Sequence, residues 1–245
     1  MHTDDTPHAP GMAGDTDRRR RWDGTVSRRA AVTPLFLAAG VVYNDWLLQF
    51  WVPTGLDQRD SYVSEAFAAD QPYRVLFSGV EVLCAAMILA GACLVVPALS
   101  CRWALAGWAA LALLAVCSIA DVALPIRCAP SREADCPVDN VAHTVTSGLV
   151  DFAVFTSIAA LAVHARSIAG RHSHAGRWAR WLLPLSMIAA IASAGPYIGI
   201  DGGQGIAQRV HLVTVGMWLW LLSAEAWHRR LPNPEKSPVK GELTG

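Results

Sequence analysis

The 245-residue sequence has few charged residues and no excess of either sign of charge. Asp, Glu, Lys and Arg make up 16% of the chain, and 20 basic side chains balance 20 acidic ones. Soluble domains carry roughly 25% charged residues. A nucleic-acid-binding protein is expected to carry a basic excess, so the composition argues against nucleic acid as a partner.

The sequence also lacks the alternation of apolar and polar residues that marks the strands of a membrane β-barrel. Its apolar residues, 53% of the total, come in long blocks instead. A helix needs roughly 20 mostly apolar residues to cross a bilayer. Six blocks reach this length, at residues 31–52, 75–99, 103–124, 142–165, 181–200 and 210–227. The alternative, a soluble helical bundle, would show polar stripes, and residues 81–99 show none beyond Glu81.

These blocks predict an all-α integral membrane bundle of six transmembrane helices over residues 31–228. Fifteen Lys and Arg residues would lie on the side of the two termini and five on the other side. Because basic residues accumulate on the cytoplasmic side, we expect a plasma-membrane protein with both termini in the cytoplasm. Residues 1–30 and 229–245 are polar, and we expect disordered cytoplasmic tails there, the first of them basic.

Two of the six cysteines fall in a predicted outer loop, whereas the other four fall in helices or at the cytoplasmic edge. Cys128 and Cys136 are eight residues apart in the segment CAPSREADC. The outer side of the membrane is oxidising, and this spacing can close a small ring. We therefore predict a Cys128–Cys136 disulfide, with two free thiols as the alternative.

Ionisable side chains inside membrane helices are energetically costly and often mark functional sites. Asp45, Glu81, Asp121 and Asp151 fall at similar depth in the outer halves of four predicted helices. A fifth carboxylate, at the cytoplasmic end, is expected to pair with Arg229. The outer groups predict one outward-facing polar cavity, with catalytic candidates Glu81, Asp121, His143, Ser147, Asp151 and His211.

The spacing of these residues supports a shared site. His143, Ser147 and Asp151 recur at intervals of four and therefore share one helix face. At most two arginines, Arg74 and Arg209, could balance the four carboxylates. Unpaired charge is expensive in a low-dielectric medium, so some carboxylates hold protons, bind a cation or are reached by water. A polar network that only fixes helix packing is the alternative.

Several functions fit such a site. The first is a membrane enzyme with acid–base or hydrolytic chemistry on a lipid or isoprenoid. There, His143 would be the general base, Ser147 a nucleophile or positioning group, and Asp121 or Asp151 the orienting carboxylate. The sequence has no G-x-S-x-G elbow. A proton-linked transporter and a structural or accessory membrane protein remain alternatives, although the cytoplasmic half is almost purely apolar and no internal repeat is visible.

Two more specific enzyme types stay open. Zinc could be held by His143, His211, Asp121 and Asp151, which resembles the ceramidase and adiponectin-receptor superfamily. The chain lacks that superfamily's late H-x-x-x-H pair, so the metal and any cofactor stay unknown. Alternatively, Glu81 with Asp121 or Asp151 could start an isoprenoid cyclisation, as paired carboxylates do in small membrane terpene cyclases, with Trp side chains lining the pocket.

The segment PTGLDQRDSYVSEAFAADQPYRVLF, residues 53–77, carries a family resemblance, together with DVALPIRCAPSREADC at 121–136 and HTVTS at 143–147. These segments resemble domain-of-unknown-function family 998, multi-pass membrane proteins of the actinobacterial type. The resemblance covers residues 32–227 and implies six helices and a plasma-membrane location, but no reaction. Some members read Ser-Glu-Leu-Gly-Ala where this chain reads SEAFA at 64–68.

The predicted outer loop between the first two helices is longer than most connections. Its acidic and aromatic residues could form a substrate loop over the cavity, for which Ser64, Glu65, Tyr73 and Arg74 are the candidates. The alternative is an amphipathic cap that lies in the membrane interface.

Overall fold

The structure, a computed structural model, describes residues 30–136, 140–167 and 173–228, and the regular elements in these ranges are all helical. The tails in which we predicted disorder lie outside the described residues, apart from Ala30. In chain order the elements are the helix Ala30–Val42, η1 (Asp45–Phe50), η2 (Val63–Phe67), α2 (Arg74–Val95), η3 (Val96–Ala98), α3 (Arg102–Ala123), α4 (Val141–Ser167), α5 (His174–Ser193), η4 (Gly195–Ile198) and α6 (Gln204–His228).

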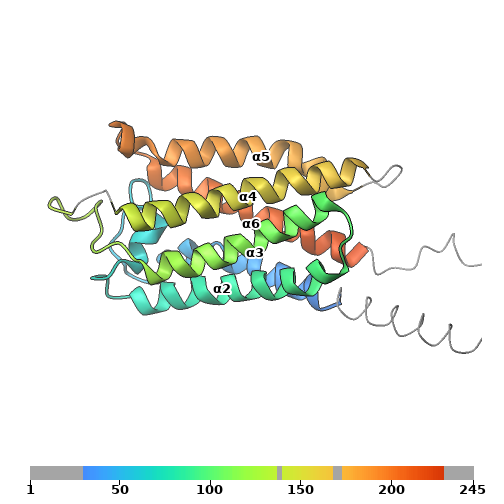
Figure 1. Ribbon diagram of the computed structural model, residues 1–245. Coiled ribbons are helices and arrows are strands. Elements are labelled where there is room, and N and C mark those ends of the chain that lie inside the picture. Colours follow the sequence, from blue (N-terminus) through green and yellow to red (C-terminus); the bar gives the residue numbers. More distant parts are fainter. Residues whose placement is uncertain (1–29, 137–139, 168–172, 229–245) are drawn as a thin grey trace, which may run out of the picture.

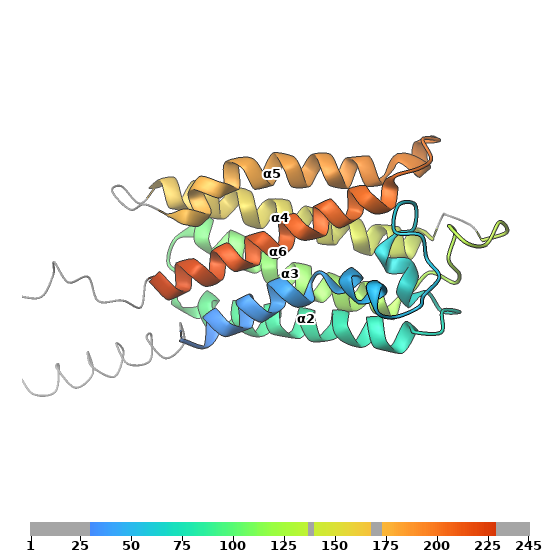
Figure 2. The same ribbon diagram turned by 180° about the vertical axis from the view of Figure 1, so that it is seen from behind.

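The long helices run up and down along one elongated bundle (Figure 1). Neighbours in the chain pack against each other from α2 to α6, and the helix Ala30–Val42 lies beside α2 and α6 (Figure 2). One end, here called the long-loop end, carries the connections at residues 43–73, 124–136 and 194–203. The opposite, short-loop end carries the turn at residues 96–101, and the described chain begins and finishes there.

Four helices are long and apolar enough to cross a membrane: Arg74–Ala98, which joins α2 and η3, then Arg102–Ala123, Val141–Ser167 and Gln204–Trp227. Their lengths of 22 to 27 residues correspond to at least about 30 Å of helix, the thickness of the hydrocarbon core. The chain is therefore a helical membrane protein, and a lipid bilayer surrounds its apolar surface.

The helix over the first predicted block is shorter than expected. We predicted one helix over residues 31–52, but the α-helical conformation stops at Val42 and a 3-10 turn, η1, follows. The Asn44 side chain folds back, donating to the carbonyl of Gly40 (3.1 Å) and accepting from the indole of Trp46 (3.1 Å). Asn is a residue that competes with the helix backbone in this way, and a hydropathy pattern does not detect it.

The helix predicted at residues 181–200 instead occupies His174–Ser193. Ser173 caps its start, because its hydroxyl accepts from the backbone N–H of Gly176 (3.0 Å). Gly195 and Pro196 follow its end and form the short turn η4. The apolar residues Ile198 and Ile200 extended the predicted block, although they belong to the following connection.

The helix Ala30–Val42 and α6 approach each other closely at two glycines. A Cβ atom on Gly216 would collide with the Gly40 carbonyl and the Asn44 amide. Small residues allow this backbone contact between membrane helices. The middle of the bundle is solid, because Leu111, Leu114, Ile158, Val215, Trp218 and Leu219 have no solvent exposure.

The connections at the long-loop end fold into a cap (residues 51–73 and 124–136) with its own apolar cluster of Leu56, Ala66, Phe67, Phe77 and Ala129. The fully buried Glu65 ties the two segments together. It accepts from the backbone N–H of Ser131 (3.1 Å), the hydroxyl of Ser131 (2.5 Å) and the backbone N–H of Tyr62 (2.8 Å). Cys128 and Cys136 form a disulfide, with their Cα atoms 5.9 Å apart.

Candidate functional site

A cavity of about 440 Å³ lies beneath the cap, at the long-loop end of the bundle. Side chains from α2 to α6 and from the cap form its walls. All six catalytic candidates from the sequence line it: Glu81 from α2, Asp121 from α3, His143, Ser147 and Asp151 from α4, and His211 from α6.

The first polar contact joins α3 and α4. Nδ1 of His143 lies 3.2 Å from Oδ1 of Asp121, although the ring N–H is not aligned for a hydrogen bond. The Asp121 carboxylate also accepts from the hydroxyls of Thr146 and Ser147, the latter at 3.0 Å. The ring of His143 stands edge-on to Phe67 of the cap. Among the described residues, Nε2 of His143 has no hydrogen-bond partner.

The second polar contact joins α4 and α6 and differs from the first. Nε2 of His211 lies 3.0 Å from Oδ1 of Asp151, and, as at His143, the ring N–H is not aligned for a hydrogen bond. Its other ring nitrogen, Nδ1, contacts the hydroxyl of Ser186 at 2.9 Å and the carbonyl of Ser186 at 3.2 Å. Phe155 packs edge-on against the ring. Both nitrogens of His211 therefore face protein groups, which is the geometry of a positioning residue.

The remaining two acidic residues of the lining come from the elements η1 and α2. Glu81 is hydrogen-bonded to the side chain of Ser118, and Asp45 enters from η1. Ser118 was missed in the sequence, although its position three residues before Asp121 places both on one face of α3.

Three tyrosines of the lining were missed as well: Tyr43, Tyr62 and Tyr197. The latter two sit on loops, where no periodicity could reveal them. The Tyr62 hydroxyl donates to the backbone carbonyl of Ser193 (2.7 Å). Burial, and then the neighbouring Tyr197, raises the pKa of Tyr62, so its hydroxyl stays protonated as a donor.

Among the residues that the structure describes, no Lys or Arg lines the cavity. Arg74, one of the two expected counter-charges, is the first residue of α2 and does not reach the lining. Arg209, the other, is directed at the cap: it donates to the carbonyls of Gln58 (2.8 Å) and Ser61 (2.9 Å) and to Oε1 of Gln49 (2.7 Å). Among the described residues of the lining, the four carboxylates therefore share the cavity with two histidines, while Arg209 acts on Asp45 from outside the lining.

The four predicted residues of the substrate loop have different environments. Ser64 lines the cavity. Glu65 is buried within the cap, where it holds Ser131. Tyr73 packs on the apolar cluster of the cap, and Arg74 begins α2. Of this segment, Ser64 reaches the cavity, together with Tyr62, Val63 and Phe67.

The zinc arrangement considered from the sequence needs at least three converging ligands. In the described part of the chain, no group of three or more His, Cys, Asp or Glu side chains is placed to hold a metal ion. His143 and His211 each contact a different aspartate instead. The geometry therefore favours two separate histidine–carboxylate pairs.

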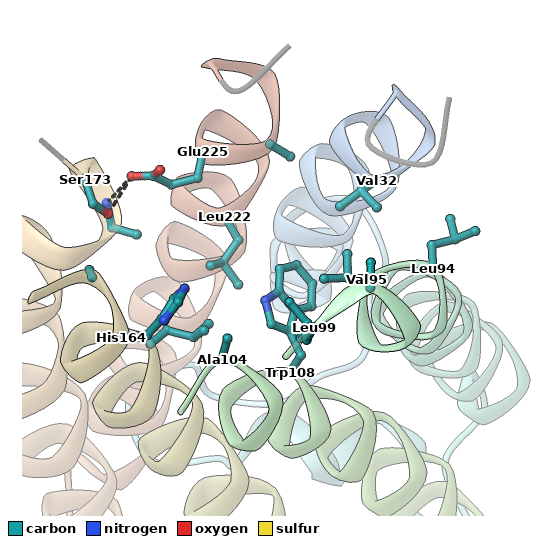
Figure 3. A pocket seen from close by; sticks show the side chains of 15 residues that line it. Val32, Leu94, Val95, Leu99, Ala104, Trp108, His164, Ser173, Leu222 and Glu225 are labelled. Carbon is teal, nitrogen blue, oxygen red and sulfur yellow. Dashed lines mark hydrogen bonds between the residues drawn. The ribbon is translucent and has the colours of Figure 1, made fainter. Parts of the chain in front are cut away.

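A second cavity, of about 160 Å³, lies at the short-loop end (Figure 3). Leu99, Trp108 and Leu222 contribute to its mainly apolar lining. At its edge, the Glu225 carboxylate accepts from the hydroxyl of Ser173 (2.7 Å) and so holds the start of α5. Arg229, the expected partner of Glu225, lies outside the described residues. The solid middle of the bundle separates this cavity from the first one.

The fold and the site define a helical membrane protein with an acidic cavity at one end of the bundle. A family model of proteins of unknown function, DUF998, matches residues 31–225. The chain therefore belongs to the DUF998 family, as its sequence segments indicated. Neither the curated proteins nor the solved structures contain a match.

Proposed function

We propose that this protein is a membrane enzyme that performs acid–base chemistry on a lipid or isoprenoid substrate in the cavity beneath the cap. The contact of His143 with Asp121 is the observation that carries the proposal. A carboxylate next to one ring nitrogen orients a histidine and stabilises its protonated form. The other nitrogen, Nε2, then accepts a proton from the substrate or from a water molecule and returns it later in the reaction.

The neighbours of this pair have supporting roles. Ser147 donates to Asp121, so it orients the carboxylate rather than attacking the substrate. His211 and Asp151 brace α4 against α6. Glu81 lines the same cavity beside Ser118, where a protonated carboxyl group could act as the acid partner of His143.

We also propose that the chain crosses the plasma membrane six times with both termini in the cytoplasm, which places the cavity at the outer face. Three observations support this orientation. Fifteen of the 20 basic residues fall on the side of the termini. The described chain begins and ends at the short-loop end (Figure 2). The disulfide lies in the cap at the other end, where an oxidising compartment would maintain it.

A proton-linked transporter is the second candidate, because four carboxylates and two histidines could relay protons. A transporter needs a route from one side to the other. The middle of the bundle is instead filled by completely buried residues such as Leu114, Ile158 and Trp218. This packing favours a site that is served from one side, as in an enzyme.

The test uses the full chain reconstituted into liposomes that contain a total lipid extract of the expression host. Lipid mass spectrometry is recorded before and after incubation. We expect a lipid species to be depleted and a product to appear with the native protein, and no change with His143→Gln or Asp121→Asn. The matched control is His174→Gln, an exposed histidine at the short-loop end, which should retain conversion. Equal conversion by His143→Gln and the native protein would refute the role of His143.

A further inference from the structure

We infer that the cavity opens sideways between α4 and α5, and that it takes a membrane amphiphile whose polar head is uncharged or cationic. The inference rests on the proposal that this cavity is the working site, and it adds the access route and the substrate class. Neither follows from the histidine–carboxylate pairs alone.

The first observation is that several residues belong both to the cavity lining and to the outer surface of the bundle. Thr144 and Gly148 of α4, and Ala194 and Tyr197 beyond the end of α5, line the cavity and are also exposed. A Cβ atom on Gly148 would meet nothing within 4 Å. The cavity therefore reaches the surface between these residues, which we call the window.

The second observation is that α4 and α5 diverge toward the long-loop end. At the short-loop end they touch, because a Cβ atom on Gly176 of α5 would lie only 2.7 Å from Cβ of Ala165 of α4. At Gly148 the space is open instead. Thr144 and Tyr197 join their hydroxyl groups across the window (3.2 Å), a single contact that rotation of one side chain could break.

The surface around the window is apolar. Val141 and Val145 on α4 and Ile188 and Ile191 on α5 are each more than half exposed, at 73%, 55%, 65% and 69%. Large exposed side chains of this kind on membrane helices face lipid tails. The window therefore opens toward the hydrocarbon region, and a substrate with an acyl or isoprenoid chain can reach the cavity without leaving the bilayer.

The charges of the cavity select the head group. Four carboxylates line it, and none of the described lining residues is Lys or Arg. The guanidinium of Arg209 is hydrogen-bonded to Gln58, Ser61 and Gln49. An anionic head would meet these carboxylates and would find no Lys or Arg among the described lining residues with which to pair. Hydroxyl groups or an ammonium group could instead donate to the carboxylates, and an ammonium group could also lie over a tyrosine ring. The fitting class is a neutral or cationic amphiphile.

Two photoreactive probes test this inference on the full chain in phosphatidylcholine vesicles. Both carry the same diazirine-labelled acyl chain. One is a diacylglycerol with an uncharged head and the other is a phosphatidylglycerol with an anionic head. Labelled positions are mapped by mass spectrometry. We expect the diacylglycerol to label the cavity wall at His143, Ser147 and Asp151, which are buried or half-buried, and the phosphatidylglycerol to label only exposed positions of the helices.

The variant Gly148→Trp places a large side chain in the window, and Gly79→Trp is its matched control. Gly79 is also an exposed helical glycine with nothing within 4 Å of an added Cβ, but it does not line the cavity. We expect labelling of His143 and Asp151 to fall to background in Gly148→Trp and to persist in Gly79→Trp. Ala194→Trp, on the opposite side of the window, provides an independent second block if Gly148→Trp does not accumulate.

Two results would overturn the inference: unchanged labelling of the cavity wall in both window variants, or equal labelling of this wall by the anionic probe. Labelling measures whether the probe reaches the cavity, and it does not measure conversion of a lipid. The proposed access route and the proposed enzyme activity can therefore fail separately. If the window variants block labelling while His143→Gln still converts lipid, the access route stands and the role of His143 is wrong. If His143→Gln abolishes conversion while the window variants change no labelling, the chemistry stands and the lateral route is wrong.

Discussion

Replacing Arg209 by Met should loosen the cap without creating a cavity in the core of the bundle. Met keeps an apolar stem of similar length but removes the charged donors. Three hydrogen bonds to other segments are lost, to the carbonyls of Gln58 and Ser61 and to Oε1 of Gln49. Hydrogen bonds that involve a charged group contribute at least about 1.5 kcal/mol each, which gives about 4.5 kcal/mol for the three at the low end of this range.

The variant should lose less free energy than this sum, because water can bind the loop carbonyls once the cap opens. Other contacts with α6 also remain, such as the bond from the backbone N–H of Ile206 to the carbonyl of Arg59 (3.2 Å). We therefore expect the free energy of opening of the cap to fall by about 3 kcal/mol. Since 1.4 kcal/mol corresponds to a factor of ten, the open population should rise by about 100-fold.

Trypsin cleavage after Arg59 measures this population in detergent-solubilised protein, because proteolysis follows the locally opened state when opening is fast. Arg132→Met is the matched control: Arg132 is an exposed residue of the cap and donates to the carbonyl of Thr54 (3.1 Å). Loss of that bond should accelerate cleavage by less than about fivefold, equivalent to 1 kcal/mol. If Arg209→Met and Arg132→Met were cleaved at the same rate, the reasoning about the cap would be refuted.

Three further outcomes are expected. Replacing both Cys128 and Cys136 by Ser should destabilise the cap by about 2.5 kcal/mol, the loop-closure entropy of so short a ring, and denaturant-dependent proteolysis that matches the native protein would contradict this. Gly216→Leu should lower thermal stability by about 1–3 kcal/mol through overpacking against the Gly40 backbone, whereas Gly79→Leu should not, as calorimetry in detergent can show. Ala134→Cys, in the exposed part of the cap, should react with an impermeant maleimide added outside intact cells, and labelling only after lysis would reverse the proposed orientation.

The sequence was sufficient to predict the helical class and most helix positions, because both depend on long apolar runs. It failed where a local interaction overrides hydropathy. The α-helical conformation of the first block ends two residues before Asn44, whose side chain bonds the backbone of Gly40. The fifth helix begins earlier than its apolar block, because Ser173 provides an N-cap and a hydropathy pattern takes no account of caps.

The candidate site could also be predicted only in part, because the sequence indicates which residues share a helix face but not which helices lie side by side. Helical spacing placed His143, Ser147 and Asp151 on one face of α4, and these residues line one wall of the cavity. Spacing could not show which side chains pair. The partner of His143 is Asp121 on α3, and the partner of Asp151 is His211 on α6. These pairings depend on how three helices are rotated in the bundle, and no periodicity within one helix contains that information.

The cap explains why a cavity persists where the helices alone would pack together. Ala190 on α5 and Gly148 on α4 are small residues of the kind that let membrane helices approach closely, yet both line open space. Tyr62 of the cap donates to the last carbonyl of α5, at Ser193, and Tyr197 reaches across to Thr144. The first contact fixes the end of α5 to the cap, and the second joins the turn after α5 to α4 across the mouth of the cavity. Since Glu65 and the disulfide hold the cap together, its integrity sets the width of the cavity, and a change that loosens the cap should alter ligand access before it alters the bundle.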